Sequence, residues 1–487
     1  MHPFIHIHII LLCIISSFFT SSAKDSKPRT QNSMVLGLSH VRSLSTPSKA
    51  LLNSTEFDFL DIIEPVTAYS DGYLLSLNLG TPPQVFQVYL DTGSDLTWVP
   101  CGTSSYQCLG CDNEHGSSNP TPTFSPAQSS SNTRELCRSR FCVDIHSSDN
   151  KYDPCAAAGC SIPAFTSGLC PIPCPPFSYT YGGGALVLGS LARDTITLHG
   201  SISGIGHFPL EFHGFSFGCV GSSIREPIGI AGFGKGTLSL PSQLGFLDRG
   251  FSHCFLGFRF ARNPNITSPL VMGDLALSET DDFLFTPMLR SITYPNFYYI
   301  GLEGVSVGDD ADAIAAPSSL SSIDSDGNGG VIVDTGTTYT HLPDPFYTTI
   351  LSSLGSAVPY ERSYDLEART GFDLCYEVPC AQAPCTDDDE LPPVSLHFLG
   401  GVKLTLPKRS CYYAVTPPKD SVVVKCLLFQ RMDDDDDVIN GDGDGTGGDM
   451  SGPGAVLGSF QMQNVEVVYD LEKGRIGFQP RDCALQA

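Results

Sequence analysis

Residues Val88–Pro100 read VYLDTGSDLTWVP, and this stretch decides what kind of protein the chain encodes. An apolar, strand-like run ends abruptly at Asp91, which is followed by Thr92, Gly93 and Ser94. A carboxyl group placed directly after buried apolar residues is costly unless it is paired or used. The stretch therefore predicts a functional turn, and the next question is whether Asp91 acts alone.

The same pattern recurs in the second half of the chain, where residues 331–343 read VIVDTGTTYTHLP. A single Asp-Thr-Gly triplet is expected only roughly 0.1 times by chance in a chain of this length. Two copies, each after an apolar run, indicate a duplicated unit. An apolar-apolar-Gly element follows each copy, at 230–232 and at 456–458. We therefore predict two related β lobes, which present Asp91 and Asp334 from equivalent turns.

The chemistry of such a pair is specific. Two carboxyl groups about 3 Å apart share one proton and titrate as a coupled pair. The charged member can act as a general base on a water molecule, while the protonated member donates to a substrate carbonyl oxygen. Peptide hydrolysis by this route needs no metal, no other cofactor and no covalent nucleophile, so none is expected. The pattern predicts an endopeptidase that acts on protein or peptide substrates, at acid pH.

Six neighbouring residues are expected to support the two carboxyl groups. Glycines allow each strand to turn sharply, threonines can hydrogen-bond between the lobes, and hydroxyl side chains can bind the outer carboxylate oxygens. In that order, these residues are Gly93 and Gly336, Thr92 and Thr335, and Ser94 and Thr337.

The composition fits a large, turn-rich β protein. The 487 residues exceed one ordinary core, and they include 48 Gly and 36 Pro with 41% hydrophobic residues. Helical periodicity is weak throughout the chain. The net charge of −25 argues against nucleic-acid binding, which requires clustered Lys and Arg. We expect a monomer.

The N-terminal region reads as a leader. Residues 1–23 are typical of a signal peptide, because an apolar run ends in small residues at cleavage spacing. The alternative, a membrane anchor, needs about 20 apolar residues, more than this run offers. Residues 24–68 begin with a basic segment, which is either a solvated leader or a prosegment whose cations pair with an acidic cleft until low pH weakens the pairing. We expect the secretory pathway, ending outside the cell, in the wall or in the vacuole, and glycosylation at Asn265.

The chain contains 18 cysteines, and nine of them lie between Cys101 and Cys174. In an exported protein this density predicts an insert stapled by disulfides. A zinc site at Cys108 and Cys111 is the alternative, although an isolated CxxC pair is a weak signal. Because Cys13 lies in the signal peptide, seventeen cysteines remain, so one should be unpaired or linked elsewhere.

These motifs resemble the pepsin-type aspartic proteases, and among them the plant nepenthesin- and nucellin-like group. The cues are the two D-T-G-[ST] turns, TWVPC, the cysteine-rich insert, FSFGC, GFGKGTLSLPSQL, FDLCY and VVYDLEKGRIGF. The resemblance covers nearly the whole chain after residue 23. It implies an all-β, bilobal fold of two β-barrels, with Asp91 and Asp334 as the catalytic dyad in the cleft between the lobes. The N-terminal lobe would span 69–280 and include the flap and the insert, and the C-terminal lobe would span 281–487 and carry an exposed acidic loop at 433–454.

The stretch YTYGGGALVLG, residues 179–189, resembles the flap hairpin of this family. The resemblance implies that Tyr181 is the flap tyrosine over the substrate, with Gly183 beside it, and that Tyr181 contacts Trp98. Tyr179 is the rival for the flap role, and simple core packing is the alternative role for Trp98. Gly183 stands where many plant relatives carry Asp, which leaves the flexibility of the flap open.

Two other functions compete with hydrolysis. A catalytically inactive protein of this fold could bind a protein partner or act as an inhibitor. Such relatives typically lack one dyad Asp or disrupt its turn, whereas both turns are intact here, which favours hydrolysis. A secreted, disulfide-rich structural glycoprotein is the third reading, and it leaves the paired turns unexplained.

Overall fold

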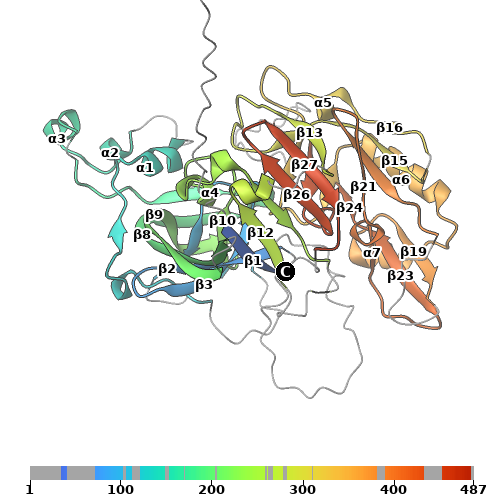
Figure 1. Ribbon diagram of the computed structural model, residues 1–487, viewed down its shortest axis with the longest axis horizontal. Coiled ribbons are helices and arrows are strands. Elements are labelled where there is room, and N and C mark those ends of the chain that lie inside the picture. Colours follow the sequence, from blue (N-terminus) through green and yellow to red (C-terminus); the bar gives the residue numbers. More distant parts are fainter. Residues whose placement is uncertain are drawn as a thin grey trace, which may run out of the picture. The chain divides into compact units, whose positions relative to one another are not determined.

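The computed structural model (Figure 1) describes residues 34–40, 72–102, 106–111, 121–147, 153–168, 170–202, 206–257, 260, 267–277, 282–309, 311–380, 390–432 and 452–483. All of them belong to one compact unit, Asn32–Ala487. The signal peptide, most of 24–68, Asn265, nearly all of the acidic loop and the boundary at 280/281 lie outside the described residues.

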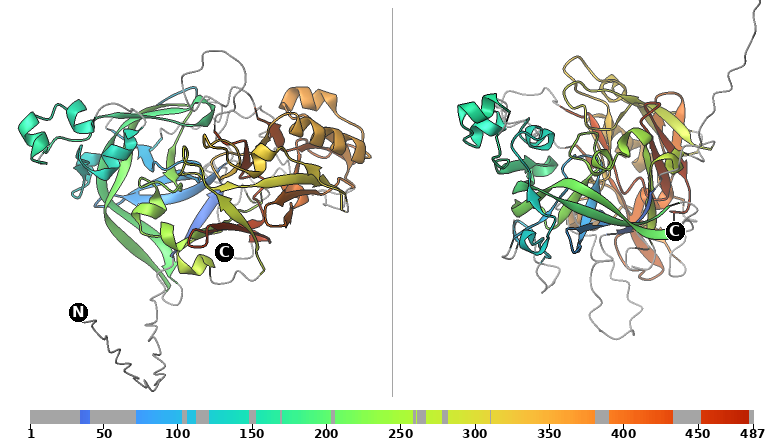
Figure 2. Two further views of the ribbon diagram at one scale, coloured as in Figure 1. Left: turned by 90° about the horizontal axis from the view of Figure 1, so that it is seen from above. Right: turned by 60° about the vertical axis from the view of Figure 1, so that its left-hand side comes forward.

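The first half of the unit is built from strands, as predicted for an all-β protein. They are β1 (Met34–His40), β2 (Tyr73–Leu79), β3 (Gln84–Asp91), β4 (Trp98–Pro100), β5 (Gln107–Leu109), β6 (Thr133–Arg134), β7 (Phe177–Thr180), β8 (Leu186–Ile202), β9 (Gly206–Ile224), β10 (Gly229–Gly232), β11 (Phe251–Cys254) and β12 (Ser268–Met272). Strands β8 and β9 form a long antiparallel hairpin, which is visible side by side in Figures 1 and 2. Strand β1, from the 24–68 segment, pairs with both β2 and β12.

The second half is built from further strands. They are β13 (Leu284–Leu289), β14 (Tyr299–Ile300), β15 (Leu302–Val307), β16 (Ile314–Ala315), β17 (Val331–Asp334), β18 (Thr340–Leu342), β19 (Cys375–Pro379), β20 (Val394–Phe398), β21 (Val402–Thr405), β22 (Tyr412–Ala414), β23 (Val422–Leu427), β24 (Phe429–Arg431), β25 (Ala455–Gly458), β26 (Val465–Asp470) and β27 (Arg475–Pro480). Strands β15, β16, β20 and β21 form one separate sheet, and β19, β22 and β23 form another.

Helices are few and short in the described part of the chain. They are α1 (Arg140–Ile145), α2 (Pro154–Ala157), α3 (Ile162–Thr166), α4 (Leu240–Gln243), α5 (Ser318–Ser321), α6 (Phe346–Ala357) and α7 (Tyr364–Thr370). Helices α1 to α3 belong to the cysteine-rich insert, on the outside of β8 and β9 (Figures 1 and 2). None of the helices in the described ranges is both long and apolar enough to cross a membrane.

One strand arrangement occurs twice, and it explains the repeat in the sequence. Strand β10 runs parallel to β3, so that Gly232 pairs with Asp91. Strand β25 runs parallel to β17, so that Gly458 pairs with Asp334. The apolar-apolar-Gly elements are therefore the strands that flank the two Asp strands.

The glycines of these elements are required by close backbone approach. A Cβ on Gly232 would lie 2.3 Å from the carbonyl oxygen of Asp95, and one on Gly458 would lie 2.4 Å from that of Tyr339. Real Cβ atoms do not approach backbone atoms so closely, so only Gly fits at either position.

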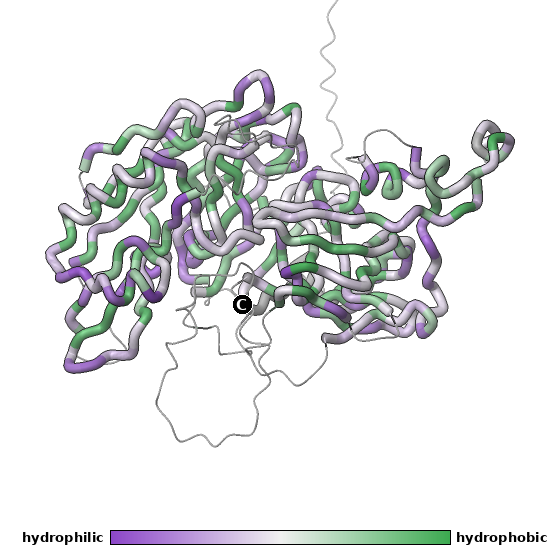
Figure 3. The backbone as a smooth tube through the Cα atoms, turned by 180° about the vertical axis from the view of Figure 1, so that it is seen from behind, coloured by the Kyte–Doolittle hydropathy of each residue, from purple (hydrophilic) through white to green (hydrophobic). Residues whose placement is uncertain are grey.

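Buried apolar side chains of the strands form the core. Figure 3 shows hydrophobic stretches of backbone interspersed with hydrophilic ones. Phe251 of β11 stacks on Tyr469 of β26 with ring centroids 4.2 Å apart, and Tyr298 packs edge-on at 4.8 Å from Tyr469. All three side chains are fully buried. Because β11 also pairs with β26, the C-terminal strands join the sheet of the first half and lock the two halves together.

The prediction of a disulfide-stapled insert is confirmed. The described disulfides are Cys101–Cys219, Cys108–Cys111, Cys137–Cys155, Cys142–Cys174, Cys160–Cys170, Cys254–Cys483 and Cys375–Cys426. Cys108 and Cys111 are bonded to each other, so the zinc alternative fails for this pair. Among the described cysteines, Cys411 is buried and unpaired, which matches the expected odd thiol.

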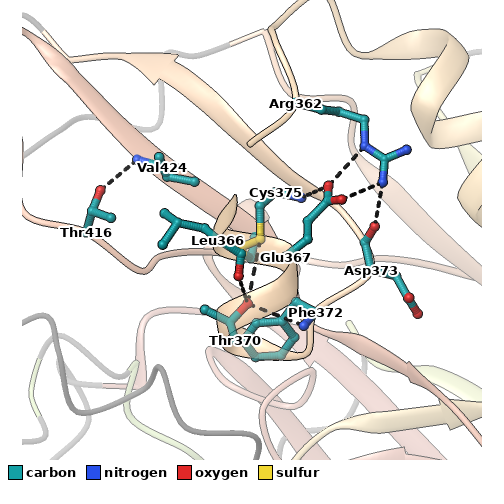
Figure 4. Close-up of a disulfide and its surroundings, with 10 residues drawn as sticks. Arg362, Leu366, Glu367, Thr370, Phe372, Asp373, Cys375, Thr416 and Val424 are labelled. Atoms are coloured by element: carbon teal, nitrogen blue, oxygen red, sulfur yellow. Dashed lines mark hydrogen bonds and ion pairs between the residues drawn. A yellow bond between two sulfur atoms is a disulfide. The ribbon is translucent and has the colours of Figure 1, made fainter. Parts of the chain in front are cut away.

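Around the disulfide between Cys375 and Cys426, an ion pair holds α7 against β19 (Figure 4). The Arg362 guanidinium donates to both carboxylate oxygens of Glu367, at 2.9 and 2.7 Å, and to the carbonyl oxygen of Asp373 at 2.9 Å. The Cys375 N–H donates to Glu367 at 2.9 Å. This charged network fixes the helix to the strand that carries the disulfide.

Candidate active site

The two Asp-Thr-Gly turns meet head to head. Asp91 ends β3 and Asp334 ends β17. A Cβ on Gly93 would lie 2.6 Å from both carboxylate oxygens of Asp334, and one on Gly336 would lie 2.4 Å from Oδ1 of Asp91. Each glycine therefore leaves room for the carboxyl group of the opposite turn, and the two carboxyl groups share one space.

Each carboxyl group accepts two hydrogen bonds from its own turn, one from a glycine N–H and one from a hydroxyl group. The bonds are Gly93 N to Asp91 Oδ1 at 2.8 Å, Ser94 Oγ to Asp91 Oδ2, Gly336 N to Asp334 Oδ1 at 2.8 Å, and Thr337 Oγ1 to Asp334 Oδ2 at 2.7 Å. Donors on both oxygens fix the orientation of each carboxyl group and stabilise a negative charge on the pair.

The two buried threonines connect the turns to each other. The Thr92 hydroxyl donates to the Val333 carbonyl at 2.8 Å and accepts from the Thr335 N–H at 3.0 Å. The Thr335 hydroxyl donates to the Leu90 carbonyl at 2.9 Å and accepts from the Thr92 N–H at 3.0 Å. Four reciprocal bonds in a dry interior hold the two Asp strands in a fixed relation.

The electrostatics of the site favour a shared proton. Burial raises the pKa of Asp91 well above its ordinary value, and the nearby Asp334 carboxylate raises it further. The Ser94 hydroxyl and the Gly93 N–H act in the opposite direction, because both donate to the charged form. Asp91 is only 7% exposed. The pair therefore retains a proton at a pH at which two separate, exposed Asp residues would both be charged.

The structure places Tyr181 against Trp98. Tyr181 lies between β7 and the short turn of Gly182–Gly184, and its hydroxyl accepts a 2.8 Å hydrogen bond from the indole N–H of Trp98. Trp98 is fully buried, so the packing role also applies. Tyr179 lies next to Tyr181, with ring centroids 5.0 Å apart, but its hydroxyl faces the Asp95 N–H at 3.5 Å.

A cavity of about 330 Å³ opens beside the first turn. It is lined by residues 93–95 of that turn, by 179–182 at the end of β7 and by 293–297 of the second half. Aromatic side chains from the predicted flap and from the second half contribute to its walls. The cavity is thus apolar with a few polar groups, which is typical of a binding site for a peptide side chain.

Asp95 is a third carboxyl group at the site, and its place there was not predicted from the sequence. It accepts from the Gly236 N–H at 2.7 Å and from the Asn296 side-chain amide at 2.5 Å. A Cβ on Gly234 or Gly236 would lie 2.3 or 2.4 Å from its oxygens, so both glycines are needed. Burial raises the pKa of Asp95 to about 6, against the hydrogen bonds from Gly236 and Asn296. The sequence signal for this contact was the presence of both DTGSD, residues 91–95, and the glycine-rich GFGKG, residues 232–236.

Glu226 is a second residue that the sequence did not reveal. Its side chain is fully buried, and neither carboxylate oxygen has a hydrogen-bond partner within the described ranges. Burial raises the pKa of Glu226 well above its ordinary value, and the nearby Asp91 raises it further. The hydroxyls of Tyr106 and Ser223 donate to its backbone carbonyl at 2.8 and 2.6 Å. A lone Glu before a Pro carries no pattern that indicates this burial.

Two groups of side chains within the described part of the chain have the spacing of metal ligands: Cys137, Cys155 and Cys170, and Cys142, His146 and Cys174. Every cysteine in both groups belongs to a disulfide. These sulfurs are therefore not free to bind a metal.

Comparison with known proteins gives matches along most of the chain. The family model described as "Xylanase inhibitor N-terminal" matches residues 73–274, and "Xylanase inhibitor C-terminal" matches residues 297–480. A probable aspartyl protease of Arabidopsis thaliana is 35% identical over 86% of this chain and 84% of its own. Nepenthesin-1 of Nepenthes gracilis, an aspartic proteinase, is 30% identical over 86% of this chain and 80% of its own.

Two solved structures with the same fold are plant globulins. Conglutin gamma from lupine, a basic 7S globulin, aligns with a TM-score of 0.60 at 17% identity, over 93% of this chain and 98% of its own. The basic 7S globulin of soybean aligns with a TM-score of 0.59 at 18% identity, over 94% and 98%. At this identity the likeness concerns the fold alone.

Proposed function

The chain belongs to the plant group of pepsin-type aspartic proteases, and on that premise we propose that it is a working endopeptidase that hydrolyses peptide bonds in acid. Its fold is the all-β, bilobal fold expected from the sequence. Membership of the family establishes the fold. Activity has to be inferred from the residues of the site.

One observation carries the proposal: Asp91 and Asp334 meet in one space, each with its own two hydrogen-bond donors. A scaffold that had lost catalysis would have no need for both carboxyl groups, both turn glycines and both hydroxyl residues. The raised pKa of Asp91 supports a single shared proton, which is the protonation state that the reaction requires.

In the proposed reaction, a water molecule lies between the two carboxyl groups. The charged carboxylate accepts a proton from this water as its oxygen bonds to the carbonyl carbon of the scissile peptide. The protonated carboxyl donates its proton to the carbonyl oxygen, which gives a neutral tetrahedral diol. The dyad then donates its proton to the peptide nitrogen and accepts one from a hydroxyl group of the diol as the C–N bond breaks. This releases the amine and the carboxylic acid and leaves the dyad with one proton.

The surroundings of the dyad support substrate binding. The cavity beside residues 93–95 can receive one substrate side chain, and the flap hairpin that carries Tyr181 lies along its wall. The bond from Trp98 holds the Tyr181 ring in place. A closed flap would exclude water and align the scissile bond with the dyad.

An inactive protein that binds a partner or acts as an inhibitor is the second candidate. It is favoured by the two matching family models, which are described as the N-terminal and C-terminal parts of a xylanase inhibitor. The intact geometry at both turns weighs against it.

We also propose that the protein passes through the secretory pathway to the cell exterior, the wall or the vacuole. The disulfides described above support an oxidising compartment. Removal of residues 24–68 as a prosegment would withdraw β1 from between β2 and β12, so maturation must rearrange that sheet.

The test is hydrolysis of a denatured protein by the matured enzyme near pH 4, with and without pepstatin. Wild type should cleave and be inhibited, whereas Asp91→Asn and Asp334→Asn should each lose activity, because Asn cannot share a titratable proton. Asp312→Asn, at an exposed carboxyl group, is the matched control and should remain active.

Activity that survives in either dyad variant would exclude the two-carboxyl mechanism. A wild type that cleaves nothing at any acid pH, with residues 24–68 removed, would favour the binding protein instead.

A further inference from the structure

We propose that Arg225 is a positioning residue that holds the tip of the flap in place. Its guanidinium group donates a hydrogen bond from Nη1 to the Gly183 carbonyl oxygen at 2.6 Å. This inference rests on the proposed function, because the position of the flap matters when a substrate is enclosed beneath it. Arg225 belongs to none of the motifs that identify the family.

The flap tip is loose by composition. Gly182, Gly183 and Gly184 follow one another, and the last two have φ of 68° and 75°, in the left-handed region. A Cβ on Gly183 would meet no atom within 4 Å, so there is open space around this residue. Three successive glycines lose much conformational freedom when they are ordered. A contact from outside the hairpin therefore helps to keep Gly183 in one place.

The base of the flap is fixed separately from its tip. The Tyr181 N–H donates to the Ala185 carbonyl at 2.8 Å, which closes the turn, and Trp98 holds the Tyr181 hydroxyl. Neither bond restrains the Gly183 carbonyl. The bond from Arg225 reaches the tip itself.

Arg225 stands on a rigid support. Strand β9 ends at the preceding residue, and the Arg225 N–H donates to the Leu109 carbonyl of β5 at 2.8 Å. The Arg225 Cγ lies 3.6 Å from where a Cβ of Gly110 would be, so the side chain passes close to the β5 turn.

The backbone of Arg225 is itself unusual. Its φ is 61°, in the left-handed region that non-glycine residues seldom adopt. The adjacent Glu226 is fully buried, and its carbonyl accepts from two hydroxyl groups, which helps to impose this conformation. A strained backbone position persists only when its surroundings determine it, and here its effect is to direct the guanidinium group to the flap.

Loss of this contact should affect binding more than the chemical step. The dyad and its hydrogen bonds are not touched by Arg225, so kcat should change little. A free tip must instead be ordered each time a substrate binds, which raises KM.

The test compares two variants of Arg225 with one matched control. Arg225→Asn suits the left-handed backbone, because Asn tolerates it, but its side chain is too short to reach Gly183. Arg225→Lys keeps a long side chain with a charged donor. Arg134→Asn makes the same change at another exposed Arg of the first half, on β6.

In peptide hydrolysis by the matured enzyme, Arg225→Asn should raise KM roughly three- to tenfold, the loss expected for one hydrogen bond. The kcat of this variant should remain close to that of wild type. Arg225→Lys should restore most of the KM, and Arg134→Asn should leave it unchanged.

A second measurement does not depend on activity. Trp98 is the single Trp of the chain, it is fully buried, and it donates to the flap residue Tyr181. Acrylamide quenching of its fluorescence in the full chain should increase in Arg225→Asn and return towards wild type in Arg225→Lys.

Equal quenching in wild type and Arg225→Asn, or quenching that Lys does not restore, would overturn the proposal. If the wild type hydrolyses no peptide, the proposed function fails, and the quenching comparison still decides whether Arg225 holds the flap.

Discussion

We expect the Asp95→Asn variant to lose less stability than wild type as the pH rises from acid to neutral. Asp95 is held by the Gly236 N–H and the Asn296 amide and is enclosed by the glycines around it. Asn has nearly the same shape, and the Asn296 amide can turn to present its oxygen to the new amide group. The main change is therefore the loss of one titrating carboxyl group.

The magnitude follows from the pKa. Burial raises the pKa of Asp95 from 3.8 to about 6, although hydrogen bonds from Gly236 and Asn296 lower it. The folded protein thus binds this proton more tightly than the unfolded chain does. The resulting stabilisation is complete below pH 3.8 and is lost as the pH rises through about 6. Two pKa units at about 1.4 kcal/mol each amount to roughly 3 kcal/mol.

The assay is urea unfolding with the disulfides intact, followed by Trp98 fluorescence, at about pH 3.5 and about pH 7.5. The free energy of unfolding of Asp95→Asn minus that of wild type should increase by roughly 3 kcal/mol between the two conditions. Any pH-independent cost of the substitution cancels in this difference. Asp312→Asn, at an exposed carboxyl group, is the control and should follow wild type. If the stability of Asp95→Asn declines with pH as steeply as that of wild type, the pKa of Asp95 is not raised in the folded protein.

Three further outcomes are expected. Gly336→Ala places a Cβ 2.4 Å from the Asp91 carboxylate, so kcat on a fluorogenic peptide should fall by roughly 100-fold, and an unchanged kcat would contradict the described packing. Trp98→Phe retains an aromatic ring but removes the donor to Tyr181, so KM should rise about fivefold, as steady-state kinetics would show, whereas an unaltered KM would mean that the bond does not position the flap. Removal of residues 24–68, monitored by gel electrophoresis, should be faster at pH 4 than at pH 7. Equal rates would mean that charge pairing does not hold this segment on the protein.

The sequence alone determined the features that lie within a few adjacent residues. Asp91 and Asp334 could be identified because the strand, the carboxyl group, the turn glycine and the hydroxyl residue are contiguous in each copy. The all-β class followed in the same way, since short apolar runs between Gly and Pro are a local pattern. The density of cysteines predicted a stapled insert for the same reason.

The tertiary structure decided which distant residues meet. The connectivity of the disulfides, such as Cys101 with Cys219, cannot be read from spacing, because nine cysteines in one stretch allow many pairings.

The contacts of Asp95 with Asn296 and of Arg225 with Gly183 depend likewise on strand register and on how the two halves pack. The burial of a carboxyl group also depends on the tertiary structure. Residues that are distant in sequence remove the group from water, and this raises its pKa. The local pattern therefore pointed to the two Asp residues that face each other, and only the folded chain could reveal the groups that surround them.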